Sequence, residues 1–133
     1  MRNIILFFAM AVTLAGCAAK SQAPDPLQVK LADYGTLPDN YKHSIASHFY
    51  FRLKDPYSAH YKFLEPYKGY SWVTDVPADK EQLMFGWIIP VIVNAKNEFG
   101  AYSGATRFMI IYSNGKYHDL STIKGTKRIT RVP

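Results

Sequence analysis

Hydrophobic residues recur every four positions in the middle of the chain, which is typical of an amphipathic helix. The members of this stripe are Tyr41, Ile45, Phe49 and Leu53. Polar residues such as Lys42 and Ser47 take the opposite side, and Pro56 disfavours helical geometry in the residue before it. The pattern therefore predicts a helix of about four turns that begins near residue 37 and ends near Asp55.

After Pro56 the hydrophobic period changes from four residues to two, which is the period of a strand with one buried face. The segments with strand character are residues 58–63, 83–94, 106–112 and 117–120, and residues 70–73 form a short, mostly apolar piece. Residues 83–94 are apolar on both sides, as in a central strand, although Pro90 cannot donate a ladder hydrogen bond. A bulge or a sheet edge at Pro90 would reconcile these two properties. Between the last two strands, Ser113-Asn114-Gly115-Lys116 is typical of a type I′ hairpin turn.

Together these elements predict an α+β fold for residues 37–120, in which one amphipathic N-terminal helix packs on a small antiparallel β-meander of three to five strands. Residues 75–82 are expected to form a charged loop within this meander. Residues 121–133 contain basic residues and no acidic one. We expect them to form a mobile tail, or a last short strand at residues 128–132.

The start of the chain has the layout of a secretory signal: a basic beginning, an apolar stretch over residues 4–12 and small residues at the end. The apolar stretch is shorter than the roughly 20 residues that a membrane-spanning helix needs. Leu14-Ala15-Gly16-Cys17 resembles the lipobox of bacterial lipoproteins. The resemblance implies that residues 1–16 are removed, and that Cys17 carries a diacylglycerol and becomes the acylated N-terminus. The alternative is an ordinary signal peptide or a membrane helix, with Cys17 as a bystander thiol.

The resemblance to lipoproteins also implies a location. An Asp directly after the acylated cysteine usually retains a lipoprotein in the inner membrane, and Ala18 stands at that position here. In a host with two membranes this favours the inner leaflet of the outer membrane, facing the periplasm. Residues 17–36 would be the acylated N-terminus and a flexible tether, since residues 18–25 are small, polar and proline-bearing. The acyl chains would hold the protein on the membrane, because each buried CH₂ contributes about 0.8 kcal/mol.

Composition narrows the possible chemistry. With 133 residues, 48% of them hydrophobic, the chain is long enough for one globular domain. A single cysteine excludes an intramolecular disulfide and a multi-cysteine zinc site. The histidines are not spaced like metal ligands and are expected on the surface, at His43, His48, His60 and His118. The sequence also lacks a nucleophile elbow, a phosphate loop and a dinucleotide fingerprint, so we expect no catalytic residue, metal or cofactor.

The connection between the two strongest strands is the most distinctive stretch after the lipobox. Residues 93–104, V-N-A-K-N-E-F-G-A-Y-S-G, resemble V-N-A-K-N-x-F/Y-G-x-Y-x-G segments of small exported bacterial proteins, and residues 55–59 resemble the accompanying D-P-x-S-A. The resemblance covers about residues 40–118 and implies a shared fold without an assigned activity. In one interpretation this stretch is only a turn, and in the other it is a recognition loop on a rigid sheet. The candidate recognition residues are Asn94, Lys96, Asn97, Phe99 and Tyr102.

The formal net charge of +6 favours anionic lipid, acidic glycan or an acidic protein over nucleic acid, which is scarce in the periplasm. The candidate residues for contact with an anionic surface are Lys124, Lys127, Arg128 and Arg131. We expect a membrane-anchored lipoprotein with a non-catalytic periplasmic domain, which serves the cell envelope as a binding or assembly accessory with a protein partner. The alternatives are a small-ligand or cell-wall-glycan binding protein and, in third place, a cell-wall hydrolase. A small-ligand carrier would need a pocket lined by Tyr61, Phe85, Trp87 and Phe108.

Overall fold

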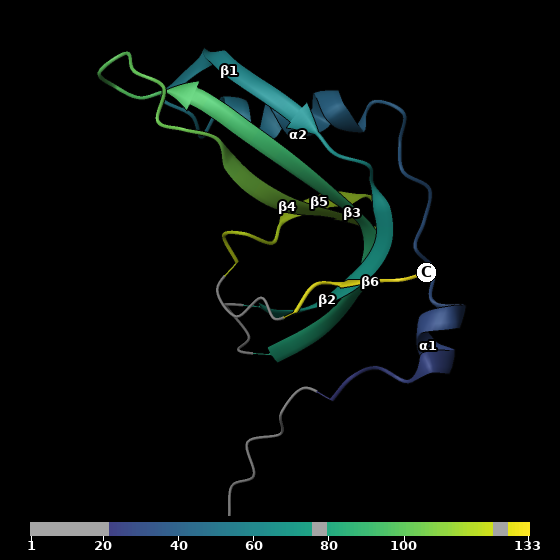
Figure 1. Cartoon of the computed structure of the whole chain (residues 1–133). Coiled ribbons are helices and arrows are strands. Elements are labelled where there is room, and N and C mark those ends of the chain that lie inside the picture. Colours follow the sequence, from purple (N-terminus) through teal and green to yellow (C-terminus); the bar gives the residue numbers. More distant parts are fainter. Residues whose placement is uncertain (1–21, 76–79, 124–127) are drawn as a thin grey trace, which may run out of the picture.

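A six-stranded antiparallel sheet forms the centre of the computed structural model, which describes residues 22–75, 80–123 and 128–133 (Figure 1). Its strands are β1 (Asp55–Phe63), β2 (Tyr67–Asp75), β3 (Lys80–Lys96), β4 (Thr106–Ser113), β5 (Lys116–Asp119) and β6 (Thr130–Arg131). The helices α1 (Pro26–Leu31) and α2 (Tyr41–Tyr50) precede the sheet in the chain. The strand order is β5-β4-β3-β2-β6, and β1 also pairs with β3.

Strand β3 is central because it pairs along both of its edges. On one edge its first half pairs with β2 and its second half with β1, while β4 takes the other edge. The Leu64 amide, between β1 and β2, donates a hydrogen bond of 3.0 Å to the Pro90 carbonyl. The backbone N–H and C=O of one strand residue point to the same edge of the strand. The position where Pro90 lacks an N–H is therefore on the edge with β1 and β2, at the point where β1 ends and β2 begins. A central strand therefore accommodates this proline.

The ribbon formed by β2 and β3 is curved (Figure 1), and it contains a pair of glycines in close contact with other strands. Gly69 and Gly86 face each other in the register of the two strands. A Cβ on Gly86 would collide with the carbonyl oxygen of Tyr112, and one on Gly69 would lie 2.6 Å from the carbonyl oxygen of Thr130. Glycine is needed at both positions because other strands approach the backbone there.

Hydrophobic cores lie on both faces of the sheet. On one face Ile45 and Phe49 of α2 pack against buried side chains of β3 and β4. The strand members of this core are Ile89, Val91, Val93 and Ile110. On the opposite face the buried residues are Val73, Ile88, Ile111 and Leu120. The two cores explain why β3 is apolar on both sides.

Several local predictions are confirmed. Ser113 pairs with Lys116, and Asn114 and Gly115 have positive φ angles of 50° and 78°, as a type I′ turn requires. The strand predicted at residues 83–94 is central, and the final short strand is β6. The predicted helix is correct in its buried stripe, but it begins at Tyr41 instead of near residue 37 and ends at Tyr50 instead of near residue 55.

The predicted fold class is wrong. The described chain is mostly antiparallel sheet with short helices, and it is not a helix on a small meander of three to five strands. Strand β1 skips β2 to pair with β3, and β6 returns from the chain end to β2. A period of two residues identifies a strand but carries no information about its partner, so the pattern could not exclude a meander.

The expected loop at residues 75–82 and the expected tether at residues 17–36 also contain regular structure. Strands β2 and β3 remain paired as far as Asp75 and Lys80, because ladder hydrogen bonds come from the backbone and tolerate polar side chains. Within the tether, Asp25 caps α1 by accepting a hydrogen bond of 2.7 Å from the Leu27 amide, and Pro26 follows at the start of the helix.

Candidate functional site

Three aromatic side chains form an exposed group where α2 meets β1. Tyr50 and Phe51 lie at the end of α2, and Tyr57 lies on β1. Phe51 and Tyr57 are each 87% exposed. The ring of Tyr50 contacts both of them edge to face, with centroids 5.3 Å from Phe51 and 5.7 Å from Tyr57. We call Tyr50, Phe51 and Tyr57 the aromatic cluster.

The exposure of this cluster follows from helical geometry. The buried stripe of α2 ends with Phe49, which is 1% exposed. Successive residues of a helix are rotated by about 100°, so Tyr50 and Phe51 lie progressively further from the core side. Beyond them the chain turns into β1, where Tyr57 points outward. The cluster is therefore accessible to a binding partner.

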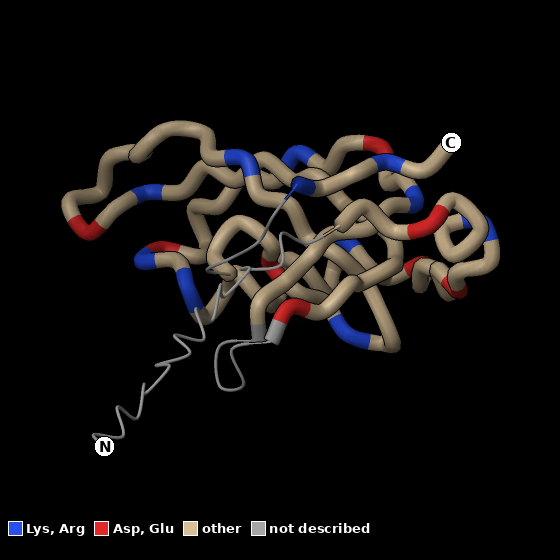
Figure 2. The backbone as a smooth tube through the Cα atoms, turned by 90° about the horizontal axis from the view of Figure 1, so that it is seen from below, with Lys and Arg blue, Asp and Glu red and all other residues tan. Residues whose placement is uncertain are grey.

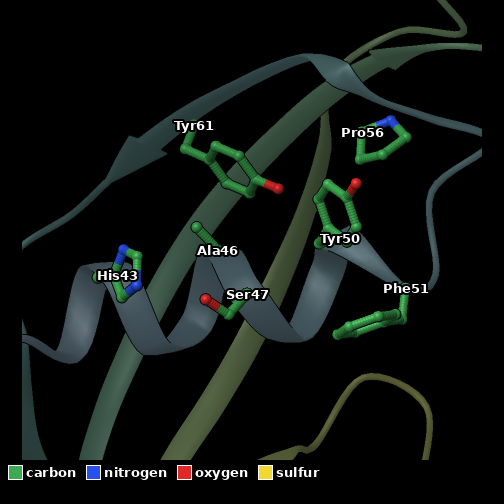
Figure 3. Close-up of a pocket in the computed structure, with 7 residues that line it drawn as sticks. All are labelled: His43, Ala46, Ser47, Tyr50, Phe51, Pro56 and Tyr61. Carbon is green, nitrogen blue, oxygen red and sulfur yellow. The ribbon is translucent and has the colours of Figure 1, made fainter.

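An open groove of about 330 Å³ lies between α2 and β1 beside the cluster (Figure 3). Its lining residues are His43, Ala46, Ser47, Tyr50, Phe51, Pro56 and Tyr61. In Figure 3 the ring of Tyr61 lies above α2, with its hydroxyl directed toward Tyr50. The walls are apolar, and polar atoms come from the imidazole of His43 and from hydroxyl groups. Apolar walls with a few polar groups are typical of binding sites.

The phenols of the groove are hydrogen-bonding groups and not acids. The hydroxyls of Tyr50 and Tyr57 share a hydrogen bond of 2.9 Å. This bond, followed by the charge of Tyr57 and by burial, raises the pKa of Tyr50 above its usual range. Burial likewise raises the pKa of Tyr61. Both phenols remain neutral near pH 7 and can donate or accept hydrogen bonds to a bound molecule.

The predicted recognition loop is held together by Asn97. Its side-chain oxygen accepts hydrogen bonds from the amides of Phe99 (3.0 Å) and Ala101 (3.1 Å). Glycines at 100 and 104 supply positive φ angles. The ring of Phe99 is 85% exposed at the tip. The structure thus shows the turn chemistry of the first interpretation, and it leaves one aromatic side chain of the loop available for contact.

Two other candidate recognition residues, Tyr102 and Lys96, contact other side chains of the protein and are not free in solvent. The Tyr102 hydroxyl hydrogen-bonds His60 Nε2 at 2.9 Å, and the Lys96 ammonium lies 5.6 Å from the centre of the Tyr102 ring. Asn94 belongs to β3 and is paired in register with His60. Its side-chain oxygen is buried without a hydrogen-bond partner among the described residues. These contacts fasten the base of the loop to the sheet.

The loop and the aromatic cluster lie at the same end of the sheet (Figure 1). Asp55, at the start of β1, pairs with Lys96, at the end of β3. A second cavity, of about 210 Å³, is bordered by the residues that follow Phe51 and by the loop; its members include Arg52, Lys54, Lys96, Asn97 and Ser103. One end of the molecule therefore carries the cluster, both cavities and Phe99.

Arg52 connects this end to the sheet, which the sequence did not indicate. Its guanidinium forms an ion pair of 2.7 Å with Asp119, a buried carboxylate at the end of β5. The other oxygen of Asp119 accepts a hydrogen bond of 3.0 Å from the Ser121 amide. The contact spans 67 residues of sequence, so only the folded chain brings the two side chains together. It fixes the position of the chain just beyond the aromatic cluster.

Of the candidate basic residues, the structure describes Arg128, which is exposed, and Arg131. Lys124, Lys127 and Cys17 lie outside the described residues. The Arg131 guanidinium lies 4.4 Å from the centre of the Tyr67 ring, at the short strand β6. Figure 2 shows basic and acidic residues interspersed along the described backbone. The side chain of Arg131 thus packs on the ring of Tyr67.

The four side chains expected to line a ligand pocket do not surround one cavity. Tyr61 borders the groove at α2 and Phe108 borders the cavity under the loop. Phe85 packs against Tyr34 and Tyr70, and Trp87 packs against the core on the α2 side. The histidines are equally dispersed, and no three His, Cys, Asp or Glu side chains gather for a metal within residues 22–75, 80–123 and 128–133.

Sequence reasoning missed the aromatic cluster. Tyr50 and Phe51 directly follow the last deeply buried position of the helical stripe, and this spacing was the available signal.

Comparisons of the chain with models of protein families, with curated proteins and with solved structures find no match. In the part of the chain that the structure describes, no helix has the length and hydrophobicity to cross a membrane.

Proposed function

We propose that this protein is a bacterial lipoprotein, anchored through Cys17 to the inner leaflet of the outer membrane, whose periplasmic domain binds a protein of the cell envelope through the aromatic cluster. The observation that carries the binding role is the exposure of three rings in mutual contact beside a groove. Contiguous exposed apolar surface on a folded domain is typical of an interaction site.

The chemistry of the cluster suits a protein partner. Tyrosine and phenylalanine supply large contact areas at a low cost in conformational entropy, and aromatic residues are enriched at the centres of protein interfaces. Phe99 is a further exposed ring, and it belongs to the β3–β4 loop, which lies at the same end of the sheet (Figure 1). A lipid anchor would confine the domain near envelope proteins, which raises the effective concentration for a weak contact.

A specific observation favours a second candidate, the binding of a glycan or another small ligand. The groove volume of about 330 Å³ lies within the range of small-molecule sites. Sugar rings can stack on aromatic faces, and Ser47, His43 and the phenol of Tyr61 offer hydrogen bonds to hydroxyl groups. A protein partner and a glycan can be distinguished by covalent capture at the cluster.

The test is photocrosslinking in growing cells, with a photoreactive phenylalanine analogue at position 51 or 57 of the lipidated chain. We expect the same envelope protein in the adducts from both positions, and no such adduct from Lys116, which is exposed on the hairpin between β4 and β5. With the photoreactive group at position 51, Tyr57→Ser should reduce the yield. Two results together would favour the second candidate over a protein partner. These are the absence of a shared adduct and the binding of a purified glycan in the groove.

The anchor is tested separately. Cys17→Ala should abolish palmitate labelling and release the protein from membranes, because no acylated residue would remain. Labelling that persists in this variant would show that the lipobox interpretation is wrong. The two experiments therefore separate the attachment of the protein from its binding surface.

A further inference from the structure

Helix α1 presents two leucines to solvent on one side. Leu27 is 61% exposed and Leu31 is 73% exposed, and none of the residues of α1 is buried. Residues four positions apart in a helix share one side, so these side chains form a small apolar face. Lys30, which is also exposed, lies in the last turn of the same helix.

Helix α1 is closed by local hydrogen bonds, and the chain that follows it is attached to the sheet. Its N-terminus is capped by Asp25, and the Tyr34 hydroxyl donates a hydrogen bond of 2.8 Å to the Val29 carbonyl. Just after it, the indole nitrogen of Trp87 donates a hydrogen bond of 3.0 Å to the Gly35 carbonyl. The segment that carries the exposed leucines is therefore attached to the sheet through Trp87 and is not a free chain end.

We infer that α1 lies on the membrane surface, with Leu27 and Leu31 inserted among the lipid headgroups and upper acyl chains. The inference rests on the proposed lipid anchor. Cys17 precedes the cap residue Asp25 by a short segment, which spans at most about 30 Å when fully extended at roughly 3.3–3.6 Å per residue. The anchored chain thus keeps α1 within reach of the bilayer.

The composition of the helix fits an interfacial site. Leucines enter the acyl boundary, while an exposed lysine can remain among anionic headgroups. Two leucines would bind a bilayer weakly by themselves. Because the acyl chains already hold the protein there, the second contact is intramolecular and needs little affinity of its own.

Membrane contact through α1 would orient the domain. In Figure 1, α1 and the β3–β4 loop lie at opposite ends of the molecule. With α1 on the bilayer, the aromatic cluster and Phe99 would face away from the membrane into the periplasm. The helix would then hold the anchored domain in one orientation, in which the aromatic cluster faces the partner.

The test uses the lipidated chain in vesicles of phosphatidylethanolamine and phosphatidylglycerol. Acylation of Cys17 leaves the mature chain without another cysteine, so Gln28→Cys introduces a single thiol on α1 and keeps both leucines. A fluorophore on this thiol should shift its emission to the blue and be quenched by nitroxide-labelled lipids. The same fluorophore on Phe99→Cys should show neither effect.

The leucines are tested in the Gln28→Cys background. Leu27→Ser with Leu31→Ser should abolish the lipid quenching, whereas Phe51→Ser, which removes another exposed hydrophobic side chain, should leave it unchanged. If the protein sediments with vesicles but position 28 is not quenched, or quenching survives the serine substitutions, the inference is overturned and the anchor stands. If the protein does not sediment with vesicles and carries no palmitate, the anchor itself is wrong and the inference fails with it.

Discussion

Phe49 and Phe51 lie two residues apart and have opposite environments. Phe49 is buried, and the centre of its ring lies 4.7 Å from the ring centre of Phe108 and 6.2 Å from that of Tyr61. Phe51 is exposed and contacts the ring of Tyr50. The first is part of the core that joins α2 to the sheet, while the second projects from the end of the same helix.

This difference shows that the aromatic residues of the chain serve separate purposes. Burial of an aromatic ring stabilises the fold, since it removes a large apolar area from water. A ring that remains exposed gains little from folding, and exposed rings that gather in one patch are typical of an interaction site. The comparison therefore separates residues that hold the fold from residues that present a surface.

The largest expected effect comes from truncating the two rings in turn. Phe49→Ala should lower the free energy of unfolding by about 3–5 kcal/mol, because it leaves a cavity in the core. Phe51→Ala should change it by no more than about 0.5 kcal/mol, yet abolish the crosslink from position 57. Urea unfolding followed by tryptophan fluorescence measures the first effect. Equal losses of stability would contradict the distinction between the two rings.

Substitution of the ion pair between Arg52 and Asp119 tests whether the exposed aromatic cluster is independent of the residues that stabilise the fold. Arg52→Ala would leave the buried carboxylate of Asp119 without its cation, and partial exposure of the arginine moderates the loss. We expect a decrease of about 2 kcal/mol in the free energy of unfolding. Because Arg52 directly follows Phe51, the crosslink from position 51 should weaken as well. Arg52→Lys, which retains the charge without the planar guanidinium, should recover part of the stability.

The sequence predicts features that depend on neighbouring residues. The turn at Asn114-Gly115 is encoded by two residues that tolerate positive φ, and the buried stripe of α2 by its spacing of four. Three features depend on partners that are distant in the sequence: the pairing of β1 with β3, the return of β6 to β2 and the need for glycine at position 86. A hydrophobic pattern contains no information on which distant strand will be the partner, so the fold class could not be derived.

The same division applies to the candidate site. The role of Asn97 in its turn is local and agrees with turn chemistry predicted from composition. The aromatic cluster depends on where α2 ends and on the path of β1 beside it, so Tyr57 could not be placed near Tyr50 from spacing. The ion pair between Arg52 and Asp119 is a similar case, because opposite charges far apart in a sequence have many alternative partners.

A smaller effect is expected at the hairpin between β4 and β5. Asn114 has a φ of 50°, a conformation that a β-branched residue adopts only with strain. Asn114→Val should therefore lower the free energy of unfolding by about 1 kcal/mol or more. Asn114→Gly, the matched control, should be nearly neutral since glycine accepts positive φ. The crosslinks from the aromatic cluster should persist in both variants, and their loss would mean that the surface is not independent of the sheet.

The smallest expected effect is a pH dependence from His118 on β5. Burial, followed by the charge of Lys116, holds the pKa of His118 below its ordinary value. The unfolded chain therefore binds a proton at a higher pH than the folded protein does, and stability falls as the pH drops below about 6.5 toward the lower folded pKa. Above that window the contribution of His118 to stability is fully present. Urea unfolding between pH 7.5 and pH 5 should show a decline in the wild type that is reduced in His118→Gln. A decline as steep in His118→Gln as in the wild type would assign the pH dependence to other groups.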